Sequence, residues 1–183
     1  MDDAAEVAAE ALRMHKQHAT QVPVHIVTHG AGALVVRRAF QLLDWEGQNT
    51  RVVMLGPPNR GSRIARRAAR SALWRATVGH GVVSELGVLG SRHFAECGDP
   101  PASASVLVIA GVSSGLAPWI PLPAGFTKGI GQHDGAVTVK EAGLRTPHSL
   151  LRVRASHATL PLSEPVIDAT LAFLSAPSAS DGL

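Results

Sequence analysis

A short apolar run stops at a glycine-bearing turn, and a helical pattern follows immediately; this feature constrains the fold most strongly. The run is Val24–Val27, with Val24, Ile26 and Val27 as its apolar residues, and the turn is Thr28–Gly32. The helical pattern starts at Ala31 and ends near Asp44–Gly47. An apolar run of strand length without alternation predicts a strand buried on both faces of a parallel sheet. The segment therefore predicts a strand, a tight turn and a helix.

This local plan is that of a nucleophile elbow, Gly-x-Ser-x-Gly, in which the reactive side chain lies on a strained strand-to-helix turn. Small residues are needed around that turn because the two backbones approach closely. Ala31, Gly32 and Ala33 meet the need, but Gly30 occupies the nucleophile position and Thr28 replaces the first glycine. Gly30 is either a degenerate nucleophile position or simply a turn residue that tolerates a left-handed backbone, and both can hold.

Four segments carry a resemblance to a known family. In chain order they are Val24–Val35, Val53–Ser62, Asp134–Val137 and Ser156-His157. They resemble, respectively, the V-H-x-V-G-H-S-x-G-G-L-V, L-G-x-P-x-x-G-S, D-G-x-V and S-H segments of bacterial lipase-like serine esterases with the α/β-hydrolase fold. The order is also the family's, with the nucleophile site first, then the acid, then the histidine. The matches cover the chain from Val22 to the C-terminus.

The resemblance implies the site residues. Asp134 would be the acid and His157 the imidazole of a triad, in which the histidine takes the nucleophile's proton and the carboxylate fixes its tautomer. The N–H of Ala31 would be the surviving oxyanion donor. Taken singly, Asp134 could belong to an ordinary Asp-Gly turn, and His157 is one of 9 histidines. Taken together, they are expected to lie beside Gly30.

Three other site readings are weaker. A nucleophile at Thr28 would lie about 6–7 Å down the strand from position 30. The Gly30-Ala31-Gly32 loop is similar to a dinucleotide-binding glycine loop, but position 35 is valine and no acidic residue ends the next strand. No metal site and no cofactor are expected, because metal-ligand spacing is lacking among His25, His29, His133 and His148.

Composition fits one domain over residues 1–183. A hydrophobic content of 45% supports a core, and a mean hydropathy of +0.14 argues against disorder. No apolar run approaches the roughly 18–20 residues of a membrane span. The acidic start at Asp2 and Asp3 lacks the plan of a signal peptide, so a cytoplasmic protein is expected. Cys97 is the only cysteine and is expected to be inert.

The basic balance of the chain is modest. The formal net charge is +3, aromatic residues make up 4%, and tyrosine is absent, so no nucleic-acid partner is expected. One predicted helix, Arg63–Trp74 with Ser62 as its cap, carries four arginines on one face: Arg63, Arg66, Arg67 and Arg70. Such a face is usually a solvated surface, and contact with a membrane surface of anionic lipid or with an acidic partner is the alternative.

The remaining pattern alternates helices and strands. Strands are predicted at Arg51–Leu55, Val106–Ala110 and Leu150–Arg154. Helices are predicted at Asp2–His18, Val83–Leu89 and Glu164–Leu174, with a helical turn within Val137–Gly143 and a frayed tail at Ser175–Leu183. In the first helix the predicted inner face is Val7, Ala8, Ala11, Leu12 and His15. Gly47 is expected to cap the helix that follows the turn, and Ser163 the last helix.

The predicted fold is an α/β-hydrolase-like parallel sheet of about four strands with helices on both faces. A complete α/β-hydrolase has further strands before the nucleophile strand, and one of their loops supplies a second oxyanion N–H. No strand pattern precedes Val24, which leaves a fragment, a misassigned start and a trimmed fold open. Val24–Val27 would then be an exposed edge through which copies of the chain could self-associate.

Two functions stay open. The first is that of a lipase or carboxylesterase relative acting on a small-molecule or lipid ester, impaired because Gly30 replaces the nucleophile. The alternative is a non-catalytic binding or scaffold protein. The substrate cannot be predicted, because acyl specificity would lie within Arg60–Gly131, which matches nothing distinctive.

Overall fold

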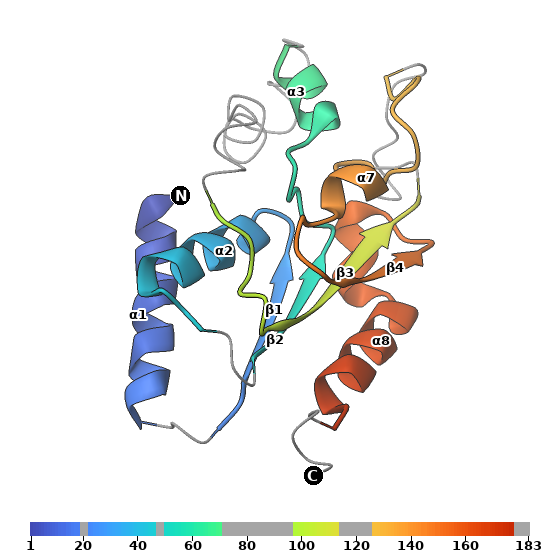
Figure 1. The fold of residues 1–183 in the computed structure, drawn as a ribbon. Helices are drawn as coiled ribbons and strands as arrows, with labels where there is room; N and C mark the ends of the chain where they lie inside the picture. Colours follow the sequence, from blue (N-terminus) through green and yellow to red (C-terminus); the bar gives the residue numbers. More distant parts are fainter. Residues whose placement is uncertain (19–21, 47–49, 71–96, 114–125, 178–183) are drawn as a thin grey trace.

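A fully parallel, four-stranded sheet of order β1-β2-β3-β4 forms the centre of the computed structural model (Figure 1). The structure describes residues 1–18, 22–46, 50–70, 97–113 and 126–177. The strands are β1 (Val24–His29), β2 (Thr50–Leu55), β3 (Ser105–Gly111) and β4 (Ser149–Val153). The helices are α1 (Asp2–His18), α2 (Gly32–Leu43), α3 (Arg63–Arg70), α7 (Val139–Ala142), the 3-10 helix η1 (His157–Leu162) and α8 (Glu164–Ser175).

Alternate side chains of the strands build two cores, one on each face of the sheet. Val52 and Met54 of β2 pack with Phe40 and other residues of α1, α2 and α7. Val53 and Leu55 point to the opposite face and pack with Leu160 of η1 and with α8. Because side chains alternate along a strand, a continuous apolar strand needs cover on both faces. The predicted fold class, a parallel sheet with helices on both faces, is confirmed.

Strand β1 is covered on one face only, so the prediction that Val24–Val27 is buried on both faces is wrong. Thr28 is buried, whereas Val27 is 51% exposed. The reason is that the core on the α8 side takes its strand residues from β2, β3 and β4. Among the described residues, β1 pairs with β2 alone and lies at the edge of the sheet.

Helix α1 has the predicted bounds but a different inner face. Its buried residues are Ala5, Ala9 and Leu12, spaced to share one stripe, whereas Val7 is 73% exposed. In an alanine-rich helix several stripes are almost equally apolar, and the packing of α1 against α2 decides between them. The sequence pattern alone does not contain that contact.

Helix α2 ends earlier than predicted. Its C-cap is Asp44, whose backbone is left-handed at φ 49°, and the Trp45 N–H donates to the Phe40 carbonyl at 3.0 Å. Asp44 therefore makes the helix stop that glycine commonly makes. The proposed cap Gly47 lies outside the described residues.

Two serines at helix starts behave differently. The Ser62 hydroxyl caps α3 as predicted: it accepts from the Ala65 N–H at 2.8 Å and donates to the Ala136 carbonyl at 2.6 Å. Ser163 occupies the N-cap of α8 but makes no side-chain capping bond. The predicted continuation of α3 to Trp74 and the helix at Val83–Leu89 lie outside the described residues.

The structure also bears on Cys97 and on membrane-spanning helices. Cys97 is buried, and as the only cysteine of the chain it has no partner for a disulfide within the chain. None of the described helices is both long and apolar enough to cross a membrane.

We expect the chain to self-associate through β1, because an open strand edge with an exposed valine is a template for another strand. Replacing Val27 with lysine should shift the sedimentation velocity profile toward monomer. Leu171→Lys on α8 is the matched control, since Leu171 is 58% exposed and lies away from the edge. A wild-type monomer at every concentration, with slow hydrogen exchange at the β1 amides, would contradict this expectation.

Candidate active site

The carboxyl ends of the four strands meet at one edge of the sheet, and the candidate site lies there (Figure 1). Gly30 follows β1, Gly56 follows β2, Gly111 ends β3, and His157 follows β4 by a few residues. The Gly30 N–H donates to the Leu55 carbonyl at 2.9 Å, and the Gly56 N–H donates to the Ile109 carbonyl at 2.8 Å. These bonds carry the sheet register into the turns, so each turn is positioned by its neighbouring strand.

Asp134 is 1% exposed and is held by hydrogen bonds with Ala136, Val137 and His157. Its Oδ1 accepts from the N–H groups of Ala136 at 2.8 Å and Val137 at 2.7 Å. Its Oδ2 lies 2.7 Å from His157 Nδ1, and its carbonyl accepts from the His157 N–H, also at 2.7 Å. Both carboxylate oxygens therefore have a donor, and His157 is held to Asp134 at two points, one on its ring and one on its backbone.

His157 faces the turn at Gly30. An ionised carboxylate only accepts, so the bond to Asp134 requires the proton on Nδ1 and leaves Nε2 as the acceptor in the neutral ring. A Cβ built on Gly30 would lie 3.1 Å from His157 Nε2. The structure thus brings together the three residues that the sequence analysis grouped as a triad site.

Gly30 and Ala31 have the conformations that an elbow needs. Gly30 has φ +55°, a left-handed backbone that glycine adopts at little cost. Ala31 is the N-cap of α2, and the N–H groups at a helix start have no partner within the helix. The N–H of Ala31 is therefore suited to the predicted role of oxyanion donor.

Thr28, the alternative nucleophile, lies within the sheet. Its hydroxyl is buried and donates to the Val53 carbonyl at 3.4 Å. That contact directs it toward β2 rather than toward His157.

His29 contacts His157 directly, a role that the sequence analysis did not assign. Its Nε2 lies 2.9 Å from the His157 carbonyl oxygen, which can only accept, so Nε2 carries a proton. The two rings lie 4.6 Å apart between centroids. Desolvation lowers the pKa of His29, and the neighbouring His157 lowers it further. The lowered pKa favours the neutral form of His29, whose ring packs beside the His157 ring.

Two glycines leave room for the acid–base pair, and the sequence analysis missed this function. A Cβ on Gly56 would lie 2.8 Å from Asp134 Oδ2 and 2.9 Å from His157 Nδ1. A Cβ on Gly111 would lie 2.7 Å from the Asp134 Cβ and 2.5 Å from the Ala155 carbonyl oxygen. Each glycine directly follows or ends a predicted buried strand, which is the signal that could have found them.

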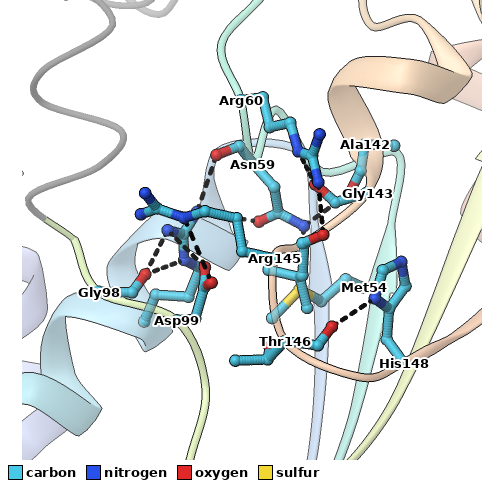
Figure 2. Close-up of polar contacts among 12 residues, drawn as sticks. Met54, Asn59, Arg60, Gly98, Asp99, Ala142, Gly143, Arg145, Thr146 and His148 are labelled. Carbon is cyan, nitrogen blue, oxygen red and sulfur yellow. Dashed lines mark hydrogen bonds and ion pairs between the residues drawn. The ribbon is translucent and has the colours of Figure 1, made fainter.

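A buried arginine ties the helix after the turn to the surrounding loops. Arg37 of α2 is 1% exposed and donates to the Gly98 carbonyl at 2.6 Å and the Asn59 carbonyl at 3.0 Å. It pairs with Asp99, which also pairs with Arg145 (Figure 2). Burial lowers the pKa of Arg37, and the charge of Asp99 opposes that shift.

Asn59 extends this network toward the segment that holds Asp134. Its Nδ2 donates to the Ala142 carbonyl at 2.7 Å (Figure 2). The network therefore fixes α2 and α7 relative to each other behind the site.

The described part of the chain contains no group of three histidine, cysteine or carboxylate residues that could hold a metal ion. His133, next to Asp134, uses its Nδ1 to accept from the Gly135 N–H at 3.1 Å. Desolvation lowers the pKa of His133. Its role is to support the turn that presents Asp134.

Solved structures of bacterial lipases resemble this chain. The Bacillus licheniformis lipase BlEst2 in its mature form aligns with a TM-score of 0.64 at 21% identity, over 90% of this chain and 73% of the lipase. The propeptide form of BlEst2 gives a TM-score of 0.70 at 22% identity, over 96% of this chain and 41% of that one. The chain has the α/β-hydrolase fold of these lipases.

A third solved structure is similar over most of this chain. Phospholipase PlaB from Legionella pneumophila aligns with a TM-score of 0.63 at 17% identity, over 97% of this chain and 48% of that one. The chain thus spans less than half the length of PlaB and of the BlEst2 propeptide form. No family model matches the sequence, and no curated protein matches it significantly.

Gly56→Ala should destabilise this α/β-hydrolase domain more than Gly129→Ala. Both glycines have positive φ, at +54° and +75°, but a Cβ on Gly129 meets no described atom within 4 Å. The control therefore carries only the backbone strain of about 1–2 kcal/mol. Overpacking against Asp134 and His157 should add about 1–3 kcal/mol. Urea unfolding measures both; equal losses would show that the pair is not packed against Gly56.

Proposed function

We propose that the chain is a lipase-like α/β-hydrolase whose site keeps the acid and base of ester hydrolysis but forms no acyl-enzyme at position 30. The observation that carries this proposal is the aim of His157: its Nε2 lies 3.1 Å from the place of a Cβ on Gly30. A hydroxyl attached there would lie within reach of the base. Glycine supplies no such hydroxyl.

The chemistry follows from two parts of the site, the Asp134–His157 pair and the N–H of Ala31. With Asp134 holding Nδ1–H, His157 Nε2 is suited to take a proton, and the Ala31 N–H to receive negative charge on a carbonyl oxygen. Loss of a nucleophile that acts as a unit with its base costs on the order of 10⁶ in turnover. The proposed activity on esters is therefore an impaired one.

A non-catalytic binding protein is the second candidate, and Gly30 favours it. A carbonyl ligand can still approach the Ala31 N–H without any group that reacts with it. Membrane-surface contact through α3 belongs to the same proposal. Arg63, Arg67 and Arg70 are exposed, and Arg67 also donates to the Phe126 carbonyl at 2.6 Å, which links α3 to that segment.

A fluorophosphonate probe should leave the wild-type chain unlabelled at position 30, since only a nucleophilic side chain forms the phosphorus–oxygen bond. Gly30→Ser should recover slow labelling. Recovery should be partial because serine in a left-handed turn costs about 1–3 kcal/mol. The His157 ring must also move by a few tenths of an ångström to admit the new Cβ. Intact-mass spectrometry measures the labelled fraction with time.

The control for this experiment is Gly30→Ser combined with His157→Ala, which should label on the order of 10² to 10⁴ times more slowly because the base is gone. Equal labelling of the two variants would show that His157 does not activate position 30. Ester hydrolysis by the wild-type chain that is lost in His157→Ala would disprove the impairment and leave Thr28 as the next nucleophile to test.

A further inference from the structure

A hollow lies beside the turn that holds Asp134. It is a groove of about 500 Å³, between the segment after β2, the residues that flank the acid turn, helix α7 and strand β4. Its size lies within the roughly 300–1,000 Å³ of small-molecule sites. None of the residues that line it is Gly30, Asp134 or His157, so an inference drawn from it does not rest on the proposed hydrolase function.

The groove is basic. Arg60, Lys140 and Arg152 line it from three different segments, and the imidazole of His148 lines it as well. Among the described residues no aspartate or glutamate lines the groove, and none forms an ion pair with any of the three cations. Three positive charges therefore face one hollow without a compensating carboxylate.

Glu141, the acidic residue that follows Lys140 in the sequence, already has hydrogen-bond donors for both carboxylate oxygens. Its Oε1 accepts from the Arg63 N–H at 2.7 Å, and its Oε2 accepts from the Thr138 N–H at 3.1 Å and the Thr138 hydroxyl at 2.8 Å. These donors hold the Glu141 carboxylate within the α7 capping box. Glu141 is buried and does not line the groove.

Two of the groove side chains are held in place by backbone groups (Figure 2). Arg60 donates to the carbonyl oxygens of Gly143 at 3.0 Å and Leu144 at 2.6 Å. A neutral carbonyl orients a guanidinium without cancelling its charge. His148 Nδ1 lies 2.8 Å from the Thr146 carbonyl oxygen. The fold therefore already holds the Arg60 and His148 side chains, so binding an anion costs less conformational entropy at these two residues.

We propose that this groove binds a phosphate-bearing ligand. A phosphate group carries up to two negative charges and several acceptor oxygens, which suits several cations around one hollow. Guanidinium groups bind such oxygens through paired N–H donors, and an ammonium group binds them as a point charge. Arg152 and Lys140 are exposed, so they can close on a ligand that Arg60 receives.

The test titrates the full-length chain with inorganic phosphate and with glycerol 3-phosphate, followed by ¹⁵N–¹H NMR. Saturable shifts are expected at the amides of Gly131 and Gly143, two backbone positions that line the groove. This readout needs no variant, so it does not depend on how a substitution folds. Absence of saturation with both probes, together with no binding to phosphatidic acid vesicles, would overturn the proposal, as would shifts confined to other regions.

The double variant Lys140→Gln/Arg152→Gln should weaken phosphate binding about tenfold, because the loss of each exposed cation should weaken it about threefold. The matched control is Lys128→Gln/Arg154→Gln, which removes the same charge from two exposed residues that do not line the groove. Its affinity should stay within about twofold of the wild type. Equal weakening in both double variants would show general attraction of anions and overturn the proposal.

Vesicles distinguish the two sources of the phosphate group. Cosedimentation compares phosphatidylcholine vesicles with and without phosphatidic acid. Binding to the soluble probes supports a free phosphate ligand. Binding only to phosphatidic acid vesicles, lost in Lys140→Gln/Arg152→Gln and kept in the control, supports a lipid headgroup in the same groove. The proposal would be overturned if neither soluble probe bound and both double variants still bound the phosphatidic acid vesicles.

Discussion

The hydrogen bond between Asp134 Oδ2 and His157 Nδ1, 2.7 Å long, connects the two segments on which the candidate site depends. Neither residue belongs to a strand: Asp134 lies on the turn before α7, and His157 is the first residue of η1. A second bond, from the His157 N–H to the Asp134 carbonyl, joins the same two segments through their backbones. The imidazole therefore has one orientation that satisfies both contacts, and in that orientation Nε2 faces Gly30.

Crowding at the strand ends explains why this orientation persists without a nucleophile. Gly56 and Gly111 approach the pair so closely that any side chain there would collide with it. His29 packs against the other side of the His157 ring. The ring is thus held by its surroundings rather than by a hydroxyl at position 30. Glycine in the left-handed turn also removes the strain that a serine would bear there.

Much of the fold could be predicted because its signals are local. Central strands β2 and β3 contain the apolar runs Val52–Leu55 and Val106–Ala110. The cap at Ser62 is a side chain three residues from its donor. The errors are non-local. The apolar run of β1 is typical of a central strand, but burial of Val27 would need a helix that packs on that face, and α8 does not extend to it.

The candidate site likewise combines features that could be predicted with contacts that depend on the three-dimensional fold. The resemblance to the esterase family, carried by four motifs in the family's order, is enough to predict that Gly30, Asp134 and His157 lie together. The contacts of His29 with the His157 ring, and the lack of space at Gly56, depend on how β1, β2 and η1 meet in three dimensions. No spacing in the sequence encodes those distances. The basic groove was missed for the same reason, since Arg60, Lys140 and Arg152 are far apart in the chain.

The tautomer of His157 tests the account most directly, because the proposed base exists only if Nδ1 carries the proton. Side-chain ¹⁵N NMR, on a sample at a pH where the ring is neutral, distinguishes the two ring nitrogens. The account predicts the Nδ1–H form in the wild-type chain and its loss as the dominant form in Asp134→Ala. A wild-type ring that is mainly Nε2–H, or a tautomer unchanged by Asp134→Ala, would contradict it.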